Sequence, residues 1–238
     1  MKHVLIIKIF TMKTDTSQND QKFSEYGLQR RTLLKFFGLG AAMVTLAACD
    51  KDDVTPVSGI DLGSGDTGIL NYAYALEQLE AAFYIQVVAT PYSGMPADEL
   101  ALLTDIRDHE IAHREFFKAA LGTSAIPALE VNFSSINFNN RTSVLSTAKT
   151  FEDLGVSAYN GAGKLISDPN YLLLAGKIVS VEARHAALIR DLISNGSFAD
   201  SEVIDANGLD KSRTPSEVLA IAGAYVTTKI NASNLPTP

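Results

Sequence analysis

Apolar side chains recur at the three- and four-residue spacing of an amphipathic helix in four long segments of the chain. Proline and glycine mark the ends of these segments, because Pro96 and Pro169 suit the first position of a helix and Gly122 and Gly196 stop one. The pattern therefore predicts four helices, with the approximate ranges 66–88, 96–121, 142–165 and 169–193.

The long stretch 122–141 between the second and third predicted helices lacks this periodicity. Its apolar residues are interleaved with Asn and Ser, which indicates a crossover with extended pieces that strap the bundle. A fifth helix is predicted from Pro215 to about residue 229, packed on the outside and followed by a loose, Pro-rich tail. The fold class expected is an all-α four-helix bundle with a long crossover and a fifth C-terminal helix.

The first 48 residues have the features of an export signal rather than of a folded element. Residues 29–35 resemble the twin-arginine motif, and the apolar run 36–48 that follows is too short to span a bilayer. This run ends in residues 46–49, which resemble a bacterial lipobox ending at Cys49. We therefore predict export by the twin-arginine pathway, lipidation of Cys49, and anchoring to a membrane in the periplasm or at the cell surface.

These patterns divide the chain into four parts. The predicted order is a signal peptide (1–48), a flexible linker (49–65), the bundle (66–195) and a C-terminal loop, helix and tail (196–238). The polar tract after the first eleven residues leads us to expect that translation starts at Met12.

Charge and cysteine content exclude several classes of function. From Cys49 onward the chain holds 13 basic and 24 acidic residues, a net charge of −11, which argues against a nucleic-acid partner. Cys49 is the only cysteine, so neither an internal disulfide nor a cysteine-based metal cluster can form.

The candidate chemistry lies in two segments that carry the same residues in the same order. In both, a Glu is followed seven residues later by a Tyr. A Glu-x-x-His begins 33 residues after that Glu in the first segment and 30 residues after it in the second. The two sets are Glu77, Tyr84, Glu110, His113 and Glu152, Tyr159, Glu182, His185.

This repeated pattern is typical of a two-metal site. Glu and His three residues apart on a helix can point at one metal, and carboxylates with a few imidazoles suit iron or manganese. A Tyr two turns from a Glu can pack beneath the site and donate a hydrogen bond to a ligand. The predicted cofactor is therefore two iron ions, with manganese as the alternative, held by the four glutamates and two histidines of the repeat in a four-helix bundle.

Three stretches, 76–84, 151–159 and 181–186, resemble the ferritin-like superfamily, and the resemblance covers about residues 66–195. It is greatest to exported ferritin-like domain proteins related to plant desiccation-associated proteins. The resemblance implies that Glu77 and Glu152 are terminal ligands, that Glu110 and Glu182 bridge the metals, and that His113 and His185 each bind one. Glu80, one turn from Glu77, could substitute for it or lie outside the ligand set. A lipid-tethered chain with a fifth helix does not resemble a storage-shell subunit, although a homodimer is possible.

A competing motif overlaps the first Glu-x-x-His. Residues 109–113 also match H-E-x-x-H, in which His109 and His113 would bind zinc, Glu110 would act as general base and Glu182 could be a third ligand. This zinc-peptidase reading leaves the second Glu-x-x-His motif and the Glu77/Glu152 pair without a purpose. In the ferritin-like reading, His109 is a flanking residue that points away from the ligand face.

Two functions of different classes remain open from the sequence. The first is a di-metal oxidoreductase acting on dioxygen or peroxide, with Tyr84 and Tyr159 as candidate catalytic residues. The second is a non-enzymatic structural or stress-protective lipoprotein in which the metal stabilises the bundle, because burying carboxylates without a cation is costly.

Overall fold

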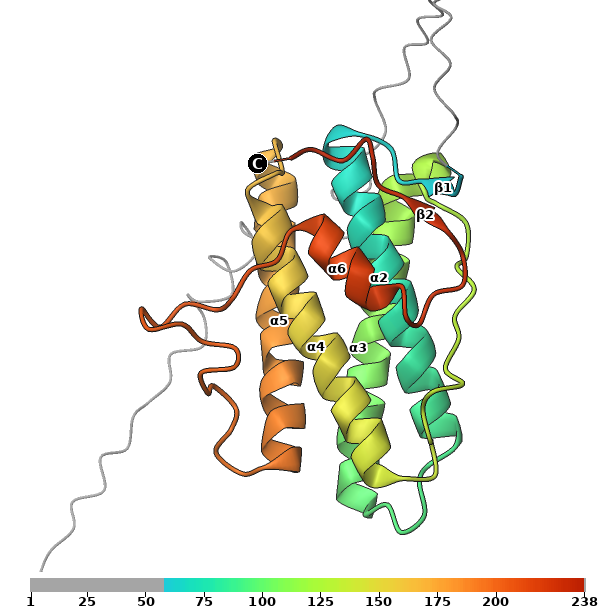
Figure 1. Ribbon diagram of the computed structural model, residues 1–238, viewed down its shortest axis with the longest axis vertical. Coiled ribbons are helices and arrows are strands. Elements are labelled where there is room, and N and C mark those ends of the chain that lie inside the picture. Colours follow the sequence, from blue (N-terminus) through green and yellow to red (C-terminus); the bar gives the residue numbers. More distant parts are fainter. Residues whose placement is uncertain (1–57, 238) are drawn as a thin grey trace, which may run out of the picture. The chain divides into compact units, whose positions relative to one another are not determined.

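The computed structural model describes residues 58–237, which lie within one compact unit. Four long helices dominate it: α2 (Gly65–Ala89), α3 (Ala97–Leu121), α4 (Arg141–Gly163) and α5 (Pro169–Ile193). α2 packs along α3 and α4 along α5, and the two helical hairpins meet through α2 and α4 (Figure 1). The predicted all-α four-helix bundle is confirmed.

The helix ends coincide with local capping residues, some of which the sequence already indicated. Gly122 ends α3 with a φ of 54°, in the left-handed region that favours glycine. Asn140 caps α4 by accepting a hydrogen bond from the Ser143 amide, and Asp168 caps α5 directly before Pro169. These caps satisfy main-chain amides that a helix start leaves without a partner.

The connection between α3 and α4 runs along the bundle (Figure 1). It starts with a short 3₁₀ turn, η1 (Gly122–Ser124), and continues in extended form. Val131 forms an antiparallel bridge with Val226, and the Thr227 amide donates to the Glu130 carbonyl at 2.8 Å. The predicted crossover is present, and the C-terminal part of the chain is hydrogen-bonded to it.

The fifth helix, α6 (Pro215–Ala222), is shorter than predicted. The sequence suggested that it continues to about residue 229, because Tyr225 extends the helical spacing. In the structure the main chain of 225–227 bonds to the crossover instead, since the Asn132 amide donates to the Tyr225 carbonyl. This tertiary pairing overrides local periodicity. Within α6, Val218 is fully buried and helps to seat the helix on α4.

The two ends of the described chain pair with each other. β1 (Ile60–Asp61) and β2 (Ile230–Asn231) form a short parallel ladder, with Leu62 and Leu235 buried beside it. The prediction of a loose tail is therefore wrong, and the flexible linker predicted over 49–65 is wrong for its last residues. The rest of that linker, the signal segment 1–48 and Cys49 lie outside the described residues.

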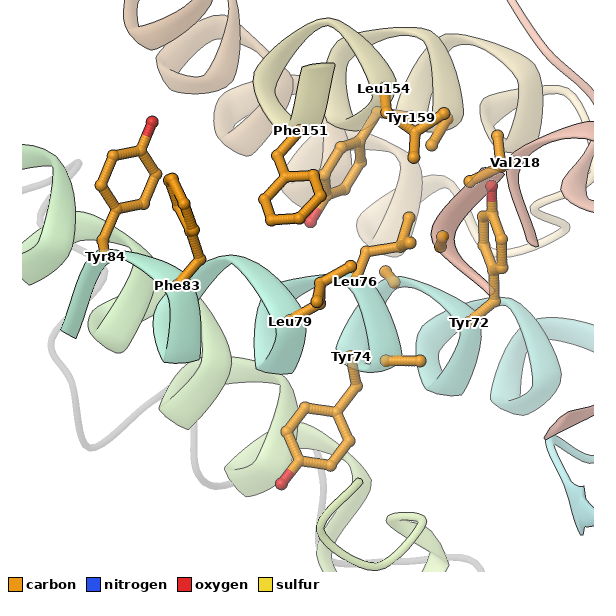
Figure 2. Close-up of a cluster of buried hydrophobic side chains, with 14 of the residues drawn as sticks. Tyr72, Tyr74, Leu76, Leu79, Phe83, Tyr84, Phe151, Leu154, Tyr159 and Val218 are labelled. Carbon is orange, nitrogen blue, oxygen red and sulfur yellow. The ribbon is translucent and has the colours of Figure 1, made fainter. Parts of the chain in front are cut away.

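Aromatic side chains fill the space between the two hairpins. Figure 2 shows Phe83 on α2 and Phe151 on α4 meeting there, with ring centroids 5.1 Å apart in an edge-to-face contact. Within the part of the chain described here, no helix is both long enough and apolar enough to cross a membrane.

Candidate metal centre

Each of the four long helices contributes one carboxylate to the same buried space. Glu77 comes from α2, Glu110 from α3, Glu152 from α4 and Glu182 from α5, and all four are 0% exposed. One turn after Glu110 and Glu182, the two motif histidines turn toward the same carboxylates. The structure thus brings together all six residues that the sequence pattern singled out as metal ligands.

The six residues form two overlapping groups, within each of which the ligand atoms lie no more than 4.8 Å apart. Glu110 and Glu182 belong to both groups, whereas Glu77 and Glu152 belong to one each. The two groups are Glu77, Glu110, His113, Glu182 and Glu110, Glu152, Glu182, His185. Two shared and two unshared carboxylates form an arrangement that can bridge a pair of metal ions.

The histidine contacts cross between the hairpins. Nδ1 of His113 on α3 lies 2.8 Å from Oε1 of Glu182 on α5, and Nδ1 of His185 on α5 lies 2.8 Å from Oε1 of Glu110 on α3. These close approaches are not directed as hydrogen bonds, because none of the four atoms has a hydrogen-bond partner among the described residues. The four atoms lie close together around a shared space and do not hydrogen-bond to one another.

The donor set fits a pair of cations. Eight buried oxygen and nitrogen atoms of the six residues lack a hydrogen-bond partner within residues 58–237. Leaving a buried polar atom unpaired costs about 1–3 kcal/mol, and more for a charged group. Six carboxylate oxygens and two imidazole nitrogens are ligands that suit iron or manganese, and coordination would satisfy all eight atoms.

The two tyrosines of the repeat bind carboxylates of the opposite hairpin. The Tyr84 hydroxyl on α2 donates to Oε1 of Glu152 on α4 at 2.5 Å, and the Tyr159 hydroxyl on α4 donates to Oε1 of Glu77 on α2. Figure 2 shows both tyrosines in the layer between these helices. In both glutamates the second oxygen, Oε2, has no hydrogen-bond partner in the described chain, so each tyrosine leaves one oxygen facing the site.

Burial and mutual repulsion shift the proton affinities of the cluster. Burial raises the pKa of Glu110 well above its usual value, and the neighbouring carboxylates of Glu182 and Glu77 raise it further. Burial and Glu77 raise the pKa of Glu182 to about 7, although His113 opposes them. Burial lowers the pKa of His113, but Glu182 and Glu77 outweigh it and raise that pKa to about 10. Without a cation, the cluster therefore retains protons.

Glu80, which the sequence left ambiguous, is a fifth buried carboxylate of this cluster. It is 3% exposed, its Oε2 has no hydrogen-bond partner in the described residues, and burial and three neighbouring glutamates raise its pKa. Glu80 follows Glu77 by three residues, and the equivalent position after Glu152 is Gly155. A Cβ atom at Gly155 would lie 2.9 Å from Oε1 of Glu80, so the missing side chain on α4 leaves room for the extra carboxylate from α2.

His109 is a flanking residue outside both groups of candidate ligands, as predicted. The sequence did not reveal that its Nδ1 lies 2.9 Å from Nε2 of His185. This contact also contradicts the zinc-peptidase geometry, because His109 faces the far side of a histidine ring and belongs to neither group of candidate ligands in the described chain. No periodicity in the sequence signals a contact between the two hairpins at this position.

Comparison with known proteins agrees with this geometry. Residues 65–195 match the model of a protein family described as "Ferritin-like domain". The matched segment extends from the start of α2 to just beyond the end of α5, and it contains all six candidate ligands. A search of curated proteins finds no match to the chain.

Proposed function

The chain belongs to the ferritin-like domain family, and from this premise we propose that it is a di-metal carboxylate protein that uses two iron ions, or alternatively manganese, in an oxidoreductase reaction with dioxygen or peroxide. The observation that carries the proposal is the set of eight unpartnered ligand atoms in two overlapping groups. A buried cluster of this composition is expensive to maintain unless a cation occupies it.

The residues divide into bridging and terminal roles. Glu110 and Glu182 would hold both metals, since each belongs to both groups, while Glu77 and Glu152 would each hold one. His113 and His185 would add one nitrogen ligand to each metal. When bound, a reduced metal pair would supply the electrons for reduction of dioxygen or peroxide, which the protein side chains alone cannot do.

We assign Tyr84 and Tyr159 as positioning residues within this function. Each hydroxyl holds one oxygen of a terminal glutamate, which fixes the carboxylate and directs its other oxygen into the site. Burial raises the pKa of both tyrosines, so both keep the proton that they donate. Both tyrosines are also buried, oxidisable side chains one hydrogen bond from a ligand. They are therefore candidates for a direct part in the reaction as well.

The experiment is to load purified protein with ferrous iron without air, to measure iron per chain, and then to admit dioxygen or peroxide. We expect iron binding to depend on the carboxylates, an iron-dependent absorbance after oxidation, and consumption of the oxidant. Glu182→Ala is the matched control, because it removes a ligand shared by both metals. Absence of both absorbance and oxidant consumption in the wild type would contradict the oxidoreductase.

The same experiment decides between this function and the non-enzymatic alternative. Full burial of four acidic ligands means that a bound cation stabilises the folded state by linkage, whether or not turnover occurs. Protein that binds two metals and melts at a higher temperature, yet consumes no oxidant, would support a structural or stress-protective role.

We also propose that the protein is an exported lipoprotein anchored through Cys49, in the periplasm or at the cell surface. The support comes from the sequence alone: a twin-arginine motif, a short apolar run and a lipobox-like ending. Labelling of cells with a radioactive fatty acid should mark the wild type but not Cys49→Ala. Equal labelling of the two proteins would refute the lipid anchor.

A further inference from the structure

His109 contacts a candidate ligand from outside the site. Its Nδ1 lies 2.9 Å from Nε2 of His185, and the two ring planes differ by only 10°. The ring centroids are 5.1 Å apart, a separation that the N–N contact and the two ring radii together account for. The rings therefore lie edge to edge in nearly one plane, which directs an N–H of one ring at the nitrogen of the other.

The two nitrogens of His185 face different surroundings. Nδ1 lies 2.8 Å from Glu110 and 3.5 Å from Glu152 without a directed hydrogen bond, whereas Nε2 forms the directed contact with His109. A neutral imidazole that binds a metal through Nδ1 carries its proton on Nε2. That proton points at Nδ1 of His109, which accepts it, and His109 then carries its own proton on its other nitrogen.

We propose that His109 is a positioning residue for one of the two metals. By accepting the Nε2 proton of His185, it fixes the tautomer and the ring orientation that present Nδ1 to the metal held by Glu110, Glu152 and Glu182. This inference rests on the proposed two-metal function. It gives a purpose to the H-E-x-x-H motif that differs from zinc binding.

The repeat provides this support on one side only. His109 directly precedes Glu110, while the residue that directly precedes Glu182 is Val181, which cannot accept a hydrogen bond through its side chain. Among the described residues, Nε2 of His113 has no hydrogen-bond partner that would correspond to His109. The metal that contacts His185 therefore has a supported imidazole and the metal that contacts His113 does not, so the two metals should differ in affinity.

The test is an equilibrium titration of the full chain with ferrous iron in the absence of air, with a chelator as competitor. His109→Leu removes the acceptor at an exposed position, and His109→Asn keeps an acceptor oxygen close to the place of Nδ1. Val181→Ala is the matched control from the other half of the repeat. We expect His109→Leu to weaken one of the two ferrous ions roughly 10–100-fold and to leave the other unchanged. His109→Asn should restore most of the lost affinity, and Val181→Ala should bind both ions as the wild type does.

The outcomes separate this inference from the proposed function. Wild type with two bound ferrous ions and His109→Leu with the same two affinities would overturn the role of His109 alone. Equal weakening of both ions in His109→Leu, or no recovery in His109→Asn, would also overturn it, because neither result fits an acceptor specific to His185. Wild type that binds no metal would overturn the two-metal function, and this inference with it.

Discussion

Removal of the metal should leave a bundle whose stability falls as the pH rises from about 5 to about 8. The cause is the group of buried carboxylates, which retain protons when no cation is present. Burial and Glu77 raise the pKa of Glu182 from 4.5 to about 7, and the pKa values of Glu80 and Glu110 are raised as well. An acid with a raised pKa in the folded state stabilises the fold below its unfolded pKa, and this stabilisation is lost as the pH rises through the folded pKa.

The size of the effect follows from Glu182. The difference between its ordinary pKa of 4.5 and about 7 corresponds to about 3 kcal/mol. In a domain of this size, 1 kcal/mol shifts the melting temperature by about 2–4 °C, so Glu182 alone predicts a loss of roughly 6–12 °C. His113, with its pKa raised to about 10, acts in the same direction, because the folded state keeps a proton that the unfolded state releases.

Other titrations do not reverse the trend. Burial and the neighbouring histidines lower the pKa of His109, so this group makes stability rise with pH and opposes the trend. The ring is largely exposed, and its contribution is small. Hydrogen bonds lower the pKa values of the exposed Glu202, Asp205 and Glu217, and these groups change charge below the chosen window.

The assay is thermal unfolding of chelator-treated protein, followed by far-ultraviolet circular dichroism across this pH range. Glu182→Gln is the control, because an amide does not titrate and should remove the share of the pH dependence that comes from Glu182, roughly 6–12 °C. Metal-loaded wild type should show the opposite trend, since metal and protons compete for the same carboxylates. A metal-free protein whose melting temperature rises or stays level with pH would refute the reasoning.

Three further predictions concern single side chains. Tyr84→Phe and Tyr159→Phe should each lower metal affinity roughly 10–100-fold without unfolding the protein, because each removes a hydrogen bond to a ligand carboxylate. Unchanged affinity in chelator competition would contradict this prediction. Gly155→Ala should alter the absorbance of the iron-loaded protein more than its melting temperature, because the new methyl group would displace a buried carboxylate of the cluster. Gly161→Ala should destabilise the fold in urea unfolding, because its Cβ would overlap a main-chain carbonyl of the C-terminal loop. By contrast, the Cβ of Gly176→Ala would meet open space, so this change should stabilise the fold by about 1 kcal/mol.

The helices were predictable because their ends carry local signals. Pro169 and Gly122 set boundaries that the structure reproduces within a residue or so. The six candidate ligands were likewise readable, because a repeat at helical spacing brings side chains to one face. The Tyr–Glu contacts required more, since the sequence showed each tyrosine on the stripe of its own helix and the hydroxyl reaches the glutamate of the other hairpin.

The features that the sequence did not reveal all depend on pairing between distant segments. Tyr225 fits a helical spacing, yet its carbonyl bonds to the crossover, and Ile60 pairs with Ile230 across almost the whole described chain. The contact between His109 and His185 has the same origin. The sequence left the role of Glu80 ambiguous, and comparison of the two halves of the repeat position by position would have favoured its place in the cluster, because its counterpart is a glycine.

The crossed ligand sets have a consequence for the order in which the protein assembles. Each group of ligands takes three residues from one hairpin and a single shared glutamate, Glu110 or Glu182, from the other. Contacts within a hairpin are close in sequence and form early, whereas Glu77 and Glu182 are brought together only when the hairpins dock. We therefore expect the proposed metals to be captured only after the hairpins dock, and a fragment that holds only α2 and α3 should bind neither ion.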